Sequence, residues 1–183
     1  MTEIPYQLIR SARKTISIQI TPAGEVIVRC PKRMSAREAE TFVQSKRSWL
    51  EKHLTKMAAK PQLPPFTPEE LRALAKQAAR IIPGRVGYFA SIVGVTYGRI
   101  TIRSQRTRWG SCSAKGNLNF NCLLALCPPE VLDYVVVHEL CHRKELNHSA
   151  RFWAEVEKVC PDYRQHKQWL KENGGTLIGR LPE

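Results

Sequence analysis

His138 and His142 carry the clearest chemical signal in the sequence. They stand four residues apart in the stretch VVVHELCH, whose apolar residues predict a helix that begins after Pro128-Pro129. Side chains at positions i and i+4 share one helix face, so both imidazoles can bind one metal ion. Glu139 projects to the side of that face, where it can act on a water molecule beside the metal.

A tetrahedral catalytic zinc site needs a third protein ligand and one open position. His148 follows His142 by six residues, so the helix must end and the chain must turn back for His148 to reach the ion. Asn147 can take the left-handed conformation that permits such a turn. A later carboxylate such as Glu155 is the alternative third ligand. The two remaining histidines stand on polar helical segments and are interpreted as surface residues: His53 and His166.

The apolar surroundings favour a metal site over structural histidines. Burying two histidines and a glutamate in such a helix would cost free energy without a purpose. Three neutral imidazoles suit zinc well. The metzincin pattern also places its third histidine six residues after the second, but with glycine at the turn, where this chain has Glu145. A metzincin is therefore disfavoured.

Local signals divide the chain into two parts. The alternating segment KTISIQI, the turn TPAGE and the segment VIVRC predict a hairpin, and the capping box Ser35–Glu38 predicts a helix to about Met57. The four prolines of residues 60–68 indicate a linker. We therefore expect an N-terminal hairpin-plus-helix segment over residues 1–60 and a catalytic domain over residues 61–183.

The second part alternates helices with short extended segments, which predicts an α+β fold. A capping box at Thr67–Glu70 opens a helix that we expect to stop at Pro83-Gly84. Residues 96–103 and 117–126 are expected to be extended, with residues 105–117 as a loop between them. Ser149 is a plausible N-cap for a helix to Cys160-Pro161, and a last helix should end at Gly174-Gly175.

The chain is strongly basic, with a net charge of +13. No Asp or Glu stands between Glu70 and Glu130, a stretch that would attract phosphate, nucleotides or nucleic acid unless its acidic partners lie elsewhere. It contains nine basic residues: Arg72, Lys76, Arg80, Arg85, Arg99, Arg103, Arg106, Arg108 and Lys115. Without a signal peptide or an 18-residue apolar run, we expect a cytoplasmic protein with no membrane segment, whose six cysteines are reduced.

Several motifs together resemble the YgjP-like metallopeptidase family, a relative of the SprT-like proteins. They are SARKT and Cys30-Pro31 near the N-terminus, then RTRWGSC, GNLNFN, Pro128-Pro129, HELCH and NHSARFW in this order. The resemblance covers nearly the whole chain. It implies a small zincin fold of the gluzincin type, with a short antiparallel sheet beside the HExxH helix. It also implies His138, His142 and His148 as zinc ligands, Glu139 as the catalytic base, and NLNFNCLLAL as the edge strand that holds the peptide.

The first functional interpretation is a zinc-dependent metallopeptidase. Zinc polarises the scissile carbonyl, and Glu139 takes a proton and passes it to the leaving amine. The group that stabilises the oxyanion is expected in the RTRWGSC loop. Asn121 either faces the substrate or ties down this loop.

Two alternatives remain open. A metal-dependent hydrolase of a phosphorylated or nucleotide substrate, such as a nucleoside triphosphate pyrophosphatase, would use Arg106 and Arg108 to clamp phosphate and Trp109 to stack on a base. The same three residues could equally brace and pack the loop. A nucleic-acid-associated protease would use the basic surface, although the sequence has no zinc finger or helix-turn-helix signature.

Overall fold

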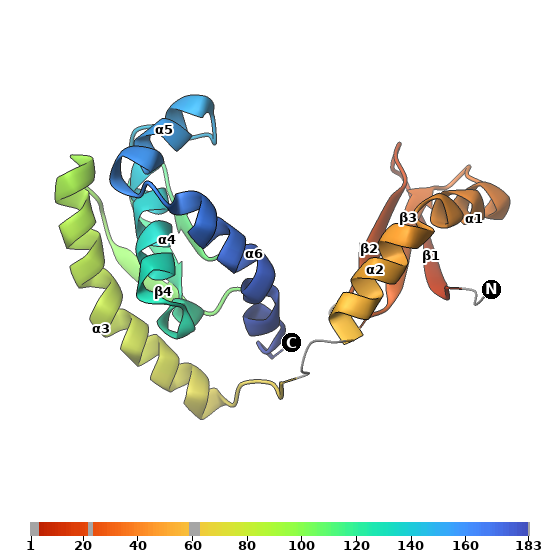
Figure 1. Ribbon diagram of the computed structural model, residues 1–183, viewed down its shortest axis with the longest axis horizontal. Coiled ribbons are helices and arrows are strands. Elements are labelled where there is room, and N and C mark those ends of the chain that lie inside the picture. The colour runs from red at the N-terminus through yellow and green to blue at the C-terminus, as the bar shows by residue number, and fades with distance from the viewer. Residues whose placement is uncertain (1–3, 22–23, 59–62, 183) are drawn as a thin grey trace. The chain divides into compact units, whose positions relative to one another are not determined.

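The computed structural model describes residues 4–21, 24–58 and 63–182, and Figure 1 shows their secondary structure. The chain forms two compact units, Met1–Gln62 and Leu63–Glu183. Each unit has a hydrophobic core of its own. Both units combine a three-stranded sheet with helices, so the predicted α+β class is confirmed.

The first unit contains the predicted hairpin. Strands β2 (Ser17–Ile20) and β3 (Val26–Pro31) pair antiparallel, with Ile18 opposite Val28. Strand β1 (Tyr6–Ser11) pairs parallel to β3, which gives the order β1-β3-β2. The side chains of β1 do not alternate between buried and exposed, so no periodic pattern marks this strand in the sequence.

The helix predicted to follow Ser35 is two helices, α1 (Ala36–Ser45) and α2 (Arg47–Ala58). The capping box is confirmed, because the Ser35 hydroxyl accepts from the Glu38 N–H while the Glu38 carboxylate accepts from the Ser35 N–H. The break lies at Lys46, whose N–H donates to the Val43 carbonyl in a tightened last turn. Val43 and Leu50 on the two helices are thereby both buried against the sheet.

The second unit begins with α3 (Pro68–Val93), which is longer than expected. Its N-terminal capping box is confirmed, but the helix continues through Pro83 and ends at Gly94, which has a φ of 74°. Pro83 is exposed, so water can solvate the carbonyl that loses its N–H partner. Buried residues recur at helical spacing on both sides of it: Leu74, Ala78, Ile82, Val86, Ala90 and Val93. Core packing along this face outweighs the local signal of the proline.

The second sheet consists of β4 (Ile100–Arg103), β5 (Gly110–Cys112) and β6 (Leu118–Asn121) in the order β4-β6-β5. It is mixed rather than purely antiparallel, because β4 runs parallel to β6. The strand expected over residues 117–126 is less than half as long, since residues Cys122–Leu126 form the 3₁₀ helix η1. The Asn121 side chain begins this turn by accepting from the Leu123 N–H.

Helix α4 (Pro129–Cys141) lies at the centre of the larger core and is followed by α5 (Ala150–Val159) and α6 (Tyr163–Gly179). Helix α6 was expected to end before Gly174-Gly175, but it continues through both glycines to Gly179. The reason is tertiary, because Gly174 lies against the indole of Trp109. Among the helices that the structure describes, none is long and apolar enough to cross a membrane.

All six cysteines are free thiols, as the sequence predicts. Three of them are buried in the two cores: Cys30, Cys122 and Cys141. Burial raises the pKa of the Cys141 thiol to about 12, and it does the same for Cys127. The thiols of Cys141 and Cys127 are therefore neutral, and they pack as small hydrophobic side chains.

The two adjacent glycines of α6 should respond oppositely to alanine. A Cβ at Gly174 would lie 2.8 Å from Cζ2 of Trp109, whereas a Cβ at Gly175 meets nothing within 4 Å. We expect Gly174→Ala to lower the free energy of unfolding by about 1–3 kcal/mol through overpacking. Gly175→Ala should raise it by up to about 1 kcal/mol, since alanine favours the helix. Urea denaturation of both variants measures the difference, and equal effects would contradict the packing of Trp109 on Gly174.

Candidate metal centre

Helix α4 ends at the second histidine of the HELCH motif, and the chain then turns back. His142 is the C-cap, and the Cys141 carbonyl accepts from the Glu145 N–H at 3.0 Å. Asn147 does not take the predicted left-handed conformation, because none of the described residues other than glycine has a positive φ. Its side-chain oxygen instead accepts from the Ser149 N–H at 3.2 Å and leads the chain into α5.

The turn brings three imidazoles together. One nitrogen from each of His138, His142 and His148 lies within 4.8 Å of the others. The Nε2 atoms of His138 and His148 are 3.0 Å apart, and the rings of His142 and His148 have centroids 4.8 Å apart. Three nitrogens converging on one point form a donor set that fits a tetrahedral metal ion with one open position.

The protonation state of this cluster also suits a metal. Burial lowers the pKa of His138 to about 3, assisted by the nearby charges of His142, His148 and Lys167. Burial also lowers the pKa of His142, although its hydrogen bond to the Glu145 carbonyl acts in the opposite direction. Metal binding requires neutral imidazole, so the lowered pKa values of His138 and His142 favour the required form.

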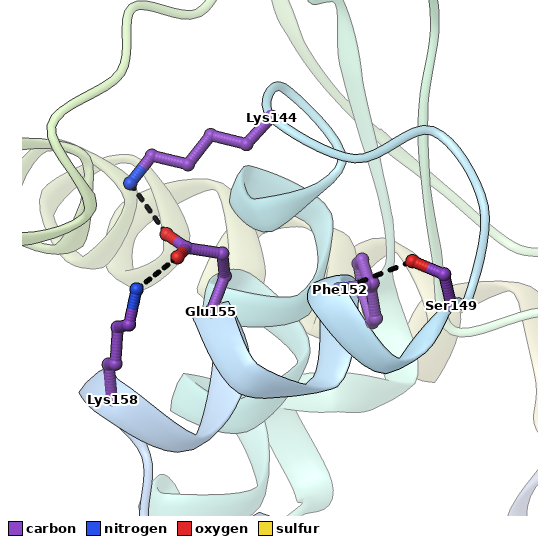
Figure 2. A network of polar contacts seen from close by, with 5 residues as sticks. All are labelled: Lys144, Ser149, Phe152, Glu155 and Lys158. Atoms are coloured by element: carbon purple, nitrogen blue, oxygen red, sulfur yellow. Dashed lines mark hydrogen bonds and ion pairs between the residues drawn. The ribbon is translucent and has the colours of Figure 1, made fainter.

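Packing and backbone contacts hold the three rings. Phe152 is fully buried, and its ring centroid lies 4.5–4.9 Å from all three imidazoles. Ser149 caps α5 by accepting from the Phe152 N–H, which fixes the backbone that carries this ring (Figure 2). The Nδ1 atom of His142 contacts the Glu145 carbonyl at 3.0 Å, which leaves Nε2 for the cluster. The Nδ1 atom of His138 is buried without a partner among the described residues, so that ring is held by packing and by the contact of its Nε2 atom with His148.

Glu139 is the one buried carboxylate among the described residues of the larger unit, with 5% of its surface exposed. Burial raises its pKa to about 8, and the positive charge of Arg108 partly opposes this rise. Strand β5 approaches the side chain closely, since a Cβ at Gly110 would lie 2.6 Å from its Oε1 atom. A cation bound by the neighbouring histidines would favour the ionised form that a base requires.

Glu155, the alternative third ligand, is engaged elsewhere. Figure 2 shows its carboxylate between Lys144 and Lys158, and the Nζ of Lys144 lies 2.7 Å from Oε2. Hydrogen bonds from the two lysines lower its pKa to about 2. Within the part of the chain that the structure describes, the group that could hold a metal comprises the three histidines alone.

The structure gives each of the four predicted substrate-binding residues contacts or charge interactions within the second unit. Trp109 packs on Gly174, and Arg106 donates to the Pro182 carbonyl at 3.2 Å. Asn121 is buried, and its side-chain amide donates to the carbonyls of Gln105 and Arg108 at 2.7 and 3.1 Å. Asn121 thus ties down the loop before β5. Arg108 acts on the site through its charge on Glu139.

Three aromatic side chains lie beside the histidines and form a wall that the sequence interpretation did not predict. We define it as Tyr134, Trp153 and Tyr163. The ring centroid of Trp153 lies 5.7 Å from that of His138 and 5.8 Å from that of His148, and Trp153 stacks on Tyr163 at 5.1 Å. Tyr134 precedes His138 by four residues, so the same spacing that paired the histidines could have placed this ring on their face.

His166 is also closer to the site than the sequence indicates. It is half-buried, and its ring centroid lies 6.4 Å from that of Tyr134. The polar residues around it on α6 indicated a surface position. His53, by contrast, contacts the Trp49 carbonyl within the first unit.

Comparison with known proteins gives a family match. The family model described as YgjP-like, metallopeptidase domain, matches residues 14–74 and 68–173. Two solved structures are similar to half of the chain, each with 24% identity: the metallopeptidase zymogens abylysin of Pyrococcus abyssi and jannalysin of Methanocaldococcus jannaschii. For abylysin, the match covers 50% of this chain and 94% of that chain with a TM-score of 0.46. The corresponding values for jannalysin are 49%, 95% and 0.41. No curated protein sequence matches significantly.

If Asn121 braces the loop, an isosteric carboxylate there should weaken the fold. In Asn121→Asp, an acceptor replaces the amide that donates to two carbonyl oxygens, so we expect a loss of about 2–3 kcal/mol in the free energy of unfolding. Asn119→Asp is the matched control, because its partner is the Ser111 hydroxyl, which can donate instead of accepting. Denaturant unfolding compares the two, and an undisturbed Asn121→Asp variant would refute the bracing role.

Proposed function

The chain belongs to the YgjP-like metallopeptidase family, and on that premise we propose that it is a zinc peptidase whose reaction takes place in the second unit. Family membership identifies the chain as a metallopeptidase that acts with a metal ion. The convergence of nitrogens from His138, His142 and His148 within 4.8 Å carries the proposal for zinc. Zinc prefers imidazole nitrogen in tetrahedral sites with one position left open for catalysis.

The neighbourhood of the cluster supports Glu139 as the base. A zinc ion held there would polarise the scissile carbonyl and acidify the attacking water. Glu139 would take a proton from the attacking water and carry it to the leaving amine. The backbone of Gly110 lies close to the carboxylate, and the charge of Arg108 favours its ionised form. Arg108 is also the candidate in this loop for stabilising negative charge on the substrate.

Strand β5 takes the role that the sequence interpretation gave to NLNFNCLLAL. That segment contributes β6, which is the central strand and has a partner on each side. Strand β5 is at the edge of the sheet, and α4 packs next to it. On either side of β5, the Trp109 carbonyl accepts from the Asn121 N–H and the Ser113 N–H donates to the Asn117 carbonyl. By the alternation of an antiparallel pair, the backbone groups of Gly110 and Cys112 point to the open edge. We propose that an extended peptide pairs along this edge beside Glu139.

The positions of the basic residues favour peptide over nucleotide chemistry. Trp109 packs on Gly174 and is therefore poorly placed to stack on a base. Arg85, from the acid-free stretch, forms a two-pronged ion pair with Asp133 on α4, at 2.6 Å in each hydrogen bond. Its acidic partner lies outside that stretch of sequence, so part of the charge that suggested a phosphate site is neutralised within the fold.

The identity of the third ligand can be tested by metal binding. We expect His148→Ala to weaken zinc binding by more than about 100-fold, because losing a direct ligand should cost more than losing an outer-shell contact. Glu155→Ala should leave zinc affinity within about twofold, since the Glu155 carboxylate binds two lysines. Competition with a chromophoric chelator measures both affinities. If Glu155→Ala bound zinc weakly and His148→Ala bound it as the wild type does, Glu155 would be the third ligand and His148 would not.

The base can be tested with Glu139→Gln. We expect this variant to bind zinc and to lose peptide hydrolysis by at least about 100-fold, because glutamine cannot accept the proton. Zinc-loaded wild type and variant would be incubated with an unfolded protein and with nucleoside triphosphates, and products read by mass spectrometry. Peptide fragments that disappear in the variant support the proposal. If the wild type forms nucleotide products that the variant does not form, and neither enzyme forms peptide fragments, the peptidase function is rejected.

A further inference from the structure

A groove with aromatic and cationic walls lies beside the metal centre. It is lined by Trp153 on α5 and by one face of α6: Tyr163, Arg164, Lys167, Gln168 and Lys171. Its volume is about 500 Å³. We refer to these six residues as the α5–α6 groove.

Trp153 connects the α5–α6 groove to the histidines. Its ring centroid lies 5.8 Å from that of His148, and the Nζ atom of Lys167 lies 4.2 Å from the centre of the same indole. An extended peptide advances about 3.3 Å per residue. A substrate held at the metal centre can therefore place a side chain in the groove from within about three residues of the scissile bond.

The charge of the groove is uncompensated at its two lysines. Within the described ranges, no carboxylate forms an ion pair with Lys167 or Lys171, whereas Arg164 pairs with Glu157 at 2.5 Å. Lys167 follows Tyr163 by four residues and precedes Lys171 by four, so these side chains share one face of α6. The Lys167 ammonium group over the Trp153 indole and the second ammonium group of Lys171 in the same groove suit a ligand that has a short apolar stem and a negative end.

We propose that the α5–α6 groove is a substrate subsite that binds a peptide carboxylate through Lys167 and Lys171, with its stem against Trp153. The peptidase would then prefer substrates with a carboxylate near the scissile bond. This proposal rests on the proposed function, because it places the groove along a bound peptide. The carboxylate has two possible sources, an aspartate or glutamate side chain or the C-terminus of the substrate.

The test uses peptides that share one scissile segment. Glutamate is compared with glutamine at each of three positions on either side of the bond, and a free C-terminus is compared with its amide. We expect kcat/KM of the full-length zinc enzyme to be about fivefold higher for the carboxylate at one of these positions, the scale of a partly exposed charge pair. The position that responds distinguishes an internal acidic residue from a chain end.

Charge reversal assigns the preference to the groove. Lys167→Glu should abolish the preference for glutamate and favour lysine at the same substrate position. Lys167→Gln should abolish the preference without reversing it. Lys76→Glu on α3 changes the net charge equally at an exposed position outside the groove, and it should retain the wild-type preference. The proposal would be overturned if the wild-type enzyme cleaved all the peptides at equal rates, or if Lys76→Glu lost the preference for glutamate as Lys167→Glu does.

Binding separates this proposal from the proposed function. The zinc-loaded Glu139→Gln variant is titrated with the labelled peptides, and affinity is read by fluorescence anisotropy. If the wild-type enzyme cleaves no peptide, the peptidase function fails. The subsite still stands if glutamate peptides bind the Glu139→Gln variant more tightly than glutamine peptides and lose this advantage when Lys167 is also replaced. If a nucleoside triphosphate competes through Lys167 while glutamate and glutamine peptides bind alike, the groove binds phosphate and the carboxylate proposal fails.

Discussion

The burial of α4 on nearly every side is the constraint on which the rest of the second unit depends. Its middle turns are apolar and pack against α3, η1, α5 and α6. His138 and Glu139 lie near the C-terminal end of this helix and His142 caps it, so the three side chains of the motif gather at one end of a buried element. The strands and loops around this end serve to complete what the helix alone cannot supply, namely a third imidazole and a strand edge beside the carboxylate.

Features that depend on near neighbours could be predicted from the sequence. Both capping boxes form between residues three positions apart, and the hairpin of β2 and β3 follows from alternation across one turn. The pairing of His138 with His142 is likewise a matter of helix spacing. His148 lies close enough in sequence that only one turn separates it from the pair, so its approach could be anticipated even though the conformation of Asn147 could not.

Features that depend on distant partners could not be predicted. Pro83 and Gly174 are local signals for helix ends, but both helices continue because their faces pack against the core or against Trp109. The type of residue at Trp109 and Asn121 fits substrate contact and loop bracing equally well. For Trp109 the distinction rests on its contact with Gly174, which lies far away in the sequence. For Asn121 it rests on a hydrogen bond to the Gln105 carbonyl, a backbone group that any residue type would offer. For the same reason only Tyr134 of the aromatic wall could have been predicted, since Trp153 and Tyr163 lie on α5 and α6.

The composition of α4 has a consequence for when the reactive centre arises. Three consecutive valines precede His138, and β-branched residues lower the intrinsic tendency to form a helix. A thirteen-residue helix of this kind would be marginal by itself in water, so it forms with the packing of the unit around it. The histidines then converge only in the folded chain, and metal uptake becomes coupled to folding. A chain still emerging from the ribosome would hold the complete motif and yet have no capacity to cut the proteins around it.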